Sequence, residues 1–90
     1  MSLVKSSHGN GIEISVSWQN GCNGSIPSGA VAAGESCFVA RAEHNGEFIP
    51  GKMSPSHKCA YVTYEGKEIA KPYYQVWYFN YNFIFNTRNK

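Results

Sequence analysis

The segment that most strongly indicates a β fold is YQVWYFNYNFIFN, residues 74–86. Its aromatic and polar side chains alternate with a period of two, which is the period of an extended strand. The aromatic face carries Trp77, Phe79, Tyr81, Phe83 and Phe85, and the opposite face carries Tyr78, Asn80, Asn82 and Asn86. A continuous strand over residues 74–85 would extend about 40 Å at ~3.3 Å per residue.

A strand of this length is too long for one small domain to cover. A compact domain of 90 residues has a radius of gyration of only about 12 Å. An uncovered edge with this many aromatic side chains would promote aggregation. The segment is therefore expected either to bend between two sheets or to cross to a second subunit, and we favour the crossing, which predicts a homodimer.

The rest of the chain carries further strand and turn signals. A half-buried strand is predicted where Ile12, Ile14, Val16 and Trp18 alternate with polar residues, and an irregular loop rich in Asn and Gly follows. Strands are also predicted at residues 38–42, 47–49 and 59–64, the second ending at Pro50-Gly51. Asn45-Gly46 suits a type I′ hairpin turn, and residues 65–68 form another turn. Since no window has a helical period, the predicted fold class is all-β, with small antiparallel sheets.

Composition and charge exclude several classes of protein. With 42% hydrophobic and 16% charged residues, the chain folds rather than remaining disordered. The net charge of +2 is scattered, without the basic cluster that nucleic acid requires. No apolar stretch approaches the roughly 20 residues that span a bilayer, so we expect no membrane insertion by this domain alone. The first residues, MSLVK, lack a signal-peptide core, which predicts a cytoplasmic protein, or a secreted one if a signal has been removed.

The cysteines and histidines do not form a catalytic or metal motif. Cys22, Cys37 and Cys59 are odd in number and lack CxxC spacing, so we expect reduced, mostly buried thiols, the alternative being one bridge between Cys22 and Cys37. His57 and Cys59 are too few for structural zinc. Neither a nucleophile elbow nor a phosphate-binding loop is present, so the protein is predicted to be non-enzymatic and to need no cofactor.

Several short segments, in a fixed order, resemble the DM-nine repeat family. That family includes the N-terminal parts of natterin-like proteins and small invertebrate lectins. Trp18 matches the leading tryptophan of the family. The matching segments that follow are GSIPSGAVAAG (24–34), FVARAEHNG (38–46), IPGK (49–52), CAYV (59–62), YEGKE (64–68) and YQV (74–76). The resemblance covers about residues 18–77 of a single domain, 1–90, and leaves residues 78–90 as a C-terminal strand for dimer exchange.

The resemblance also carries expectations about assembly and ligand. Family members with a described fold resemble two tandem repeats about a pseudo-twofold axis, with strands exchanged, whereas this chain holds one repeat. A twofold homodimer is therefore expected to complete the fold. The implied function is binding of mannose-type sugars, through an acidic residue after the Gly-Ala-Val loop and the lysine of Pro-Gly-Lys. These positions match Glu35 and Lys52. The loop at Glu35 is shorter than in the family, and sugar binding weakens if this draws Glu35 away from Lys52.

The residues themselves leave alternatives open. A carboxylate beside an ammonium can bind vicinal sugar hydroxyls from two sides, but Glu35 and Lys52 are also ordinary surface charges. His44 and Asn45, at the hairpin tip, are further candidate carbohydrate contacts. Arg41 is expected to form a structural ion pair or to contact ligand. Trp18 and Trp77 are assigned to packing.

Two functions follow from these expectations. The first is a mannose-binding lectin, acting in immune recognition or agglutination with mannose-type glycans as partners. The alternative is a non-catalytic protein interaction or assembly module related to natterin-like pore-forming proteins.

Overall fold

The computed structural model describes residues 2–5 and 11–84, with the surroundings of side chains described for residues 14–80. It is an all-β structure: the described residues contain strands and turns but no helix, as predicted. No helix long and apolar enough to cross a membrane occurs among them. The strands are β1 (Ser2–Lys5), β2 (Gly11–Cys22), β3 (Ala32–Gly34), β4 (Cys37–His44), β5 (Glu47–Ser54), β6 (Cys59–Tyr64), β7 (Lys67–Lys71) and β8 (Tyr73–Ile84).

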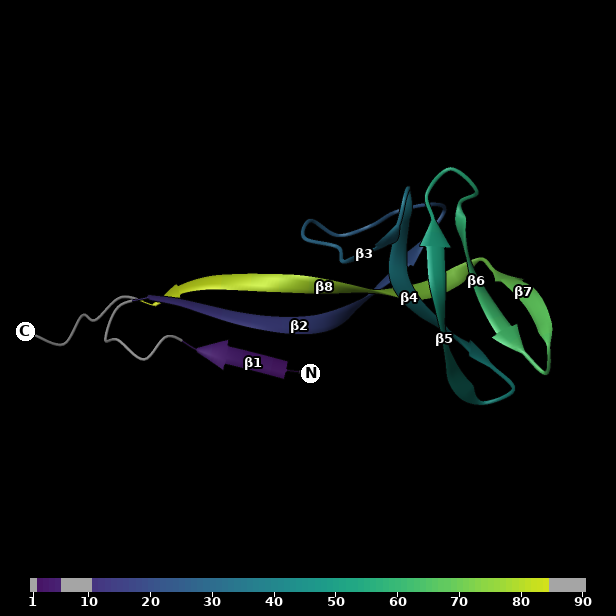
Figure 1. Ribbon diagram of the computed structural model, residues 1–90, viewed down its shortest axis with the longest axis horizontal. Coiled ribbons are helices and arrows are strands. Elements are labelled where there is room, and N and C mark those ends of the chain that lie inside the picture. The colour runs from purple at the N-terminus through teal and green to yellow at the C-terminus, as the bar shows by residue number, and fades with distance from the viewer. Residues whose placement is uncertain (1, 6–10, 85–90) are drawn as a thin grey trace, which may run out of the picture.

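All eight strands belong to one antiparallel sheet rather than to the several small sheets predicted (Figure 1). Seven strands follow in the order β1-β2-β8-β4-β5-β6-β7, and β3 pairs with β4 off this path. The sheet has two parts. Strands β4 to β7 curl into a body, and β2 and β8 leave the body together as a long arm, with β1 beside β2.

The hydrophobic core lies on one face of the body. Alternate side chains on the central strands point to it, because successive residues of a strand face opposite sides of the sheet. The fully buried members are small or medium in size: Ala40, Ala42, Met53, Ala60, Val62 and Val76, with Tyr74 at 4% exposure. The intervening residues of the same strands form an outer face, which carries the side chains considered below.

Two hairpins of the body share the same turn geometry. Asn45 and Gly46 both have positive φ, 52° and 81°, so the predicted type I′ turn is confirmed. Glu65 and Gly66 repeat this geometry with φ values of 51° and 77°. The second turn is therefore shorter than predicted, and Lys67 already begins β7, a strand that sequence analysis did not anticipate.

The prediction that the strand after the first hairpin ends at Pro50-Gly51 is wrong. β5 continues to Ser54, and Pro50 pairs with Arg41 of β4. Proline fits because the β5–β6 ladder begins only at Gly51, so that β5 is an edge strand at Pro50. Gly51 is required by a close approach of β6: a Cβ there would overlap the carbonyl oxygen of Tyr61 and lie 2.9 Å from Val62 Cγ1.

The long C-terminal strand is confirmed as a strand, but it does not bend between two sheets. β8 pairs with β2 of its own chain over twelve residues, from Cys22↔Tyr73 to Gly11↔Ile84. The arm makes the molecule elongated: its longest extent is 57 Å and its radius of gyration is 16.3 Å, against about 12 Å for a compact domain of this length. The predicted exchange of this strand with a second subunit stays a prediction, and Phe85 and Asn86 lie outside the described residues.

Candidate functional site

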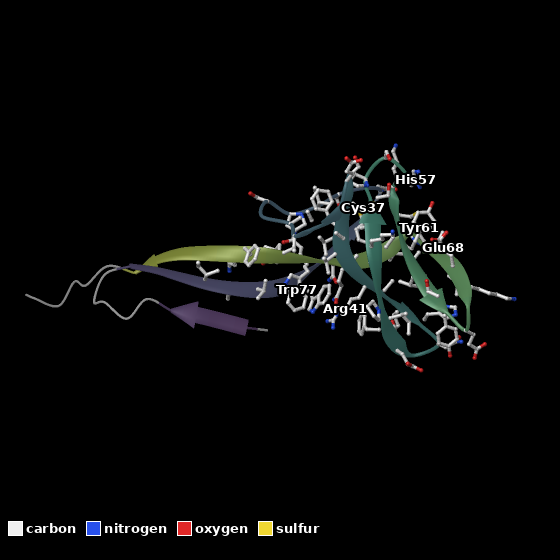
Figure 2. All side chains as sticks on the ribbon, in the orientation of Figure 1. Cys37, Arg41, His57, Tyr61, Glu68 and Trp77 are labelled. Atoms are coloured by element: carbon white, nitrogen blue, oxygen red, sulfur yellow. The ribbon has the colours of Figure 1, made fainter. Side chains whose placement is uncertain are left out.

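A hollow of about 440 Å³ lies on the outer face of the body, at one end of β5 and β6. Its centre is set by the β5–β6 register, in which Lys52 is opposite Tyr61. Because Gly51 and Met53 face the core side, Lys52 points outward. The full lining is Glu35, Ser36, Cys37, Lys52, Ser54, Ser56, His57, Tyr61 and Glu68. Figure 2 shows Cys37, His57, Tyr61 and Glu68 grouped at this end of the molecule. We call it the Lys52 hollow.

Glu35 reaches the hollow from the turn between β3 and β4. The turn is tight, with Ser36 at a φ of 60° and Gly34 at a φ of 133°. Glu35 and Lys52 line the same hollow although the loop is short, so the shortening has not drawn the two residues to different places. The hollow thus holds one ammonium together with the carboxylates of Glu35 and Glu68.

A histidine–tyrosine pair forms another wall. His57 Nδ1 is hydrogen-bonded to the Tyr61 hydroxyl at 2.9 Å, and the two rings meet edge to face at 5.6 Å. A turn fixes His57, because the His57 and Lys58 amides both donate to the Ser54 carbonyl, at 3.1 and 2.9 Å. The hydrogen bond with the Cys59 side chain, followed by partial desolvation and the charge of Glu68, raises the pKa of Tyr61 above 10.0. The phenol therefore remains protonated at neutral pH.

The serines add neutral hydroxyl groups to this charged rim. Ser54 Oγ and Ser56 Oγ are 3.3 Å apart and hydrogen-bonded, and Ser54 is only 8% exposed. Hydroxyls both donate and accept, so the hollow offers each kind of partner that a polyhydroxylated ligand needs.

His44 and Asn45 are not part of this hollow. His44 is half-buried with its ring edge to face against Tyr64, at 4.7 Å between centroids. Asn45 is exposed at the hairpin turn. Glu47, the first residue after that turn, lies five residues before Lys52 on β5, or about 17 Å along the strand. The structure therefore brings together Glu35 and Lys52 of the four candidate carbohydrate contacts, and places the other two at the opposite end of β5.

Arg41 has different partners from those expected. The structure shows no ion pair of Arg41 with a described carboxylate. Instead its guanidinium carbon lies 4.3 Å from the Trp18 ring centroid and 4.4 Å from that of Phe48. Its Nε donates to Gln75 Oε1 at 2.7 Å. Trp18 also contacts Trp77 edge to face, with 4.5 Å between centroids, so both tryptophans take part in packing.

Most of the hollow was missed by sequence reasoning. Tyr61, Glu68 and Ser56 were not identified as site residues, and His57 was considered only as a metal ligand. One signal was present: in residues 59–64, Cys59, Tyr61 and Thr63 alternate with apolar core positions. The pairing of Tyr61 with Lys52 could not be inferred until the course of β5 beyond Pro50 was known.

The cysteines are free thiols, all three half-buried rather than fully buried. The alternative of a Cys22–Cys37 bridge is therefore not what the structure shows. Among the described ranges, 2–5 and 11–84, no group of three or more His, Cys, Asp or Glu side chains is placed to hold a metal ion.

Comparison with known proteins supports the resemblance noted above. A family model described as DM9 repeat matches residues 7–71 and, in a second and overlapping match, residues 33–89. The match is wider than the predicted 18–77, and it comprises two overlapping repeats where a single repeat was expected. No curated protein matches the chain. DM9 proteins include mannose-binding lectins, and the family is generally non-catalytic. Because the two matches together cover most of the sequence, the chain belongs to the DM9 repeat family.

Proposed function

We propose that this protein is a carbohydrate-binding lectin and that the Lys52 hollow takes a mannose-type sugar. The observation that carries the proposal is the presence of Glu35 and Lys52 in one hollow, although they come from different segments of the chain. Family membership supports the same function.

The chemistry of the hollow suits vicinal hydroxyl groups. Lys52 donates up to three hydrogen bonds and accepts none, whereas the Glu35 carboxylate only accepts. Two adjacent sugar hydroxyls can accept from the first group and donate to the second, in charge-assisted hydrogen bonds. Ser54, Ser56 and the His57–Tyr61 pair then provide neutral partners for the remaining hydroxyls.

Titration with methyl α-mannoside, followed by NMR chemical shifts and calorimetry, tests the proposal. Lys52→Ala should weaken binding about 10- to 100-fold, the factor for losing a hydrogen bond to a charged group worth ~1.5–3 kcal/mol. Glu35→Gln should weaken it about tenfold. Lys67→Ala and Glu47→Gln are matched controls, since both residues are exposed and lie outside the hollow.

The two controls should bind like the wild-type protein. If millimolar mannoside causes no shift and no heat with the folded wild-type chain, the hollow does not bind mannose. If the controls lose binding as much as Lys52→Ala, the effect is one of net charge and not of the site.

We also propose that the arm pairs with a second copy of the chain, giving a homodimer with two sugar sites. One edge of β8 is covered by β2 throughout. The other edge of β8 pairs with β4 only at Gln75 and Val76. Further along β8, the Phe79 amide donates to the Gly29 carbonyl of the preceding loop at 3.0 Å. Past that point, the described part of β8 has no strand on this edge, and exposed edges are templates for pairing. Two weak sites would then gain avidity on clustered glycans, as immune recognition or agglutination requires.

Sedimentation equilibrium of two variants tests the dimer. The Phe79 amide points to the edge of β8 that is away from β2. The Tyr81 amide points to the same edge, because the backbone groups of alternate residues in an antiparallel strand point the same way. Tyr81→Pro removes that donor, whereas Tyr81→Thr keeps it in a residue suited to strands. We expect a dimer for Tyr81→Thr and a monomer for Tyr81→Pro at micromolar concentration. A monomeric wild-type protein would rule the dimer out.

The alternative function is a protein assembly module, and the protruding arm is the observation that favours it. Glycan binding separates the two functions. Under the alternative, Lys52→Ala and Glu35→Gln would leave the assembly state unchanged and no sugar would bind to the wild-type protein.

A further inference from the structure

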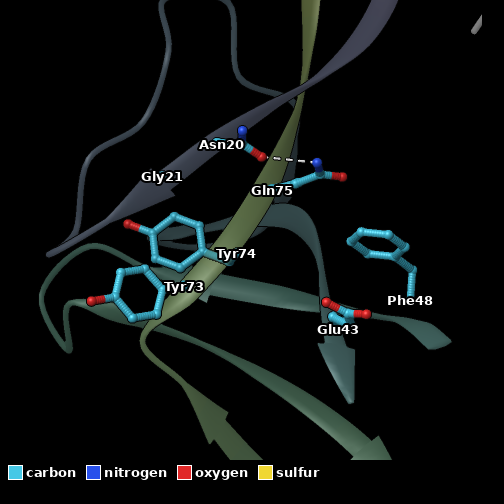
Figure 3. Close-up of a pocket in the computed structure, with 7 residues that line it drawn as sticks. All are labelled: Asn20, Gly21, Glu43, Phe48, Tyr73, Tyr74 and Gln75. Atoms are coloured by element: carbon cyan, nitrogen blue, oxygen red, sulfur yellow. Dashed lines mark hydrogen bonds between the residues drawn. The ribbon is translucent and has the colours of Figure 1, made fainter. Parts of the chain in front are cut away.

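We propose that a second hollow, on the same outer face of the sheet, binds a pyranose ring between two aromatic side chains. This hollow has a volume of about 360 Å³ and is lined by Asn20, Gly21, Glu43, Phe48, Tyr73, Tyr74 and Gln75. We call it the Tyr73 hollow (Figure 3). The inference extends the proposed lectin function, but it involves none of the residues of the Lys52 hollow.

Two exposed aromatic rings flank this hollow. Figure 3 shows Tyr73 and Phe48 on opposite sides of it, with Glu43 nearer to Phe48 and the amides of Asn20 and Gln75 above. Tyr73 is 75% exposed and Phe48 is 49% exposed, so much apolar surface remains in water. Covering these rings with a ligand would remove that surface from water, which is favourable.

The polar groups of the hollow are oriented by a relay that begins at Arg41. Arginine has only donors, so the atom of Gln75 that accepts from Arg41 Nε must be the amide oxygen. Gln75 Nε2 therefore donates to Asn20 Oδ1, at 2.9 Å. This leaves the Asn20 amide group and one N–H of Gln75 as donors, and the Glu43 carboxylate as an acceptor.

The Phe48 wall is held by the same arginine. The guanidinium carbon of Arg41 lies 4.4 Å from the Phe48 ring centroid and 4.3 Å from that of Trp18. Such cation–π contacts restrict the ring without covering its remaining surface. A preformed wall lowers the cost of ordering side chains when a ligand binds.

These features together match a pyranose better than an anion or a folded protein. A pyranose has an apolar C–H face that stacks on an aromatic ring, and hydroxyls at its rim that both donate and accept. The hollow supplies rings at its sides and amide donors with a carboxylate acceptor between them. Glu43 disfavours an anionic ligand by like-charge repulsion, and the small volume excludes a folded partner from entering it.

The two hollows can act on one glycan. Cys37 and Glu43 belong to β4, and both face outward because they are six positions apart and side chains alternate between the two faces. Cys37 lines the Lys52 hollow and Glu43 lines the Tyr73 hollow, so their strand positions are about 20 Å apart. An oligosaccharide of several units could contact both.

NMR titration of the full chain carrying Lys52→Ala tests this proposal, because that change weakens the Lys52 hollow and leaves binding at the Tyr73 hollow to be measured by itself. The probes are methyl β-glucoside and methyl α-mannoside at millimolar concentration. We expect shifts of the side-chain amide signals of Asn20 and Gln75 and of the Tyr73 ring signals. Adding Tyr73→Ala should weaken this binding about tenfold, whereas Tyr73→Phe, which keeps the ring, should retain it.

The proposal fails if neither glycoside shifts these signals in the folded Lys52→Ala protein. It also fails if Tyr73→Ala and Tyr73→Phe behave alike, since stacking would then have no part in the binding. Failure of the Lys52 hollow of the wild-type protein to bind mannoside would count against the proposed function and would leave these signals unaffected. If the Asn20 and Gln75 signals change only with protein concentration, the hollow is part of an interface between copies of the chain, and the sugar assignment is wrong.

Discussion

Replacing Gly51 by alanine should destabilise the protein through a steric conflict between two paired strands. An added Cβ would overlap the Tyr61 carbonyl oxygen and lie 2.9 Å from both the Tyr61 carbonyl carbon and Val62 Cγ1. The nearest atoms are backbone, so a side-chain rotation cannot relieve the overlap. Strands β5 and β6 must separate by roughly 1.5 Å to restore ordinary van der Waals distances.

The expected loss in the free energy of unfolding is about 3 kcal/mol. Overpacking of a core costs ~1–3 kcal/mol, and each weakened ladder hydrogen bond adds about 1 kcal/mol. Urea denaturation measures the loss: with a slope of ~1.5 kcal/mol/M, the midpoint should fall by about 2 M. Since Lys52 and Tyr61 face each other beside this point, mannoside binding should weaken too.

Gly46→Ala is the matched control for this prediction. A Cβ at Gly46 meets no atom within 4 Å, but the residue has a φ of 81°. Alanine there should cost only the backbone strain of positive φ, about 1 kcal/mol. If Gly51→Ala unfolds at the same urea concentration as wild type, or if Gly46→Ala is the more damaging change, the close approach of β6 at Gly51 is not what the structure describes.

Three further changes test other parts of the structure. Met53→Ala empties a fully buried position and should lower the free energy of unfolding by about 2–5 kcal/mol in urea denaturation; a loss below 1 kcal/mol would contradict its place in the core. Arg41→Lys should cost about 1 kcal/mol in the same assay and shift the Gln75 amide signals in NMR spectra, because lysine cannot keep both the stacking and the Nε hydrogen bond; unchanged Gln75 signals would refute the relay. For Tyr61, the folded-state pKa lies above the 10.0 of the unfolded chain. Its contribution to stability should be complete below pH 10 and lost as the pH rises through the folded value; phenolate absorbance should show Cys59→Ala lowering that pKa, and no change would contradict the side-chain hydrogen bond.

Local patterns were sufficient to predict much of the body. The alternation in residues 59–64 matches β6 residue for residue, and Asn45-Gly46 forms the predicted turn, because both depend on neighbours in the sequence. β5 was cut short at Pro50 because a proline in a strand is unfavourable unless the strand is an edge there, and edge status depends on where β6 begins. β7 was missed because its five residues have no clear apolar period.

The site was less predictable than the fold. The family resemblance identified Glu35 and Lys52, but their neighbours come from the β5–β6 register and from the turn after Ser54. The partners of Arg41 could not be predicted from the sequence either. Its charge suggested an ion pair, yet the strand order places two aromatic rings and an amide beside it. Partners of this kind are fixed by which strands become neighbours, and sequence spacing alone does not give that order.

The pairing of β2 with β8 also bears on how the protein is made. The ladder joins residues 11–22 to residues 73–84, so its two halves are synthesised far apart in time, whereas the hairpins on either side of Asn45-Gly46 and Glu65-Gly66 are complete soon after translation. Contacts of large sequence separation form slowly, since a long loop must close first. During synthesis the edge of β2 that pairs with β8 therefore stays open while the body forms, although β1 already lies on its other edge. In that interval the open edge can pair with a neighbouring nascent chain or bind a chaperone.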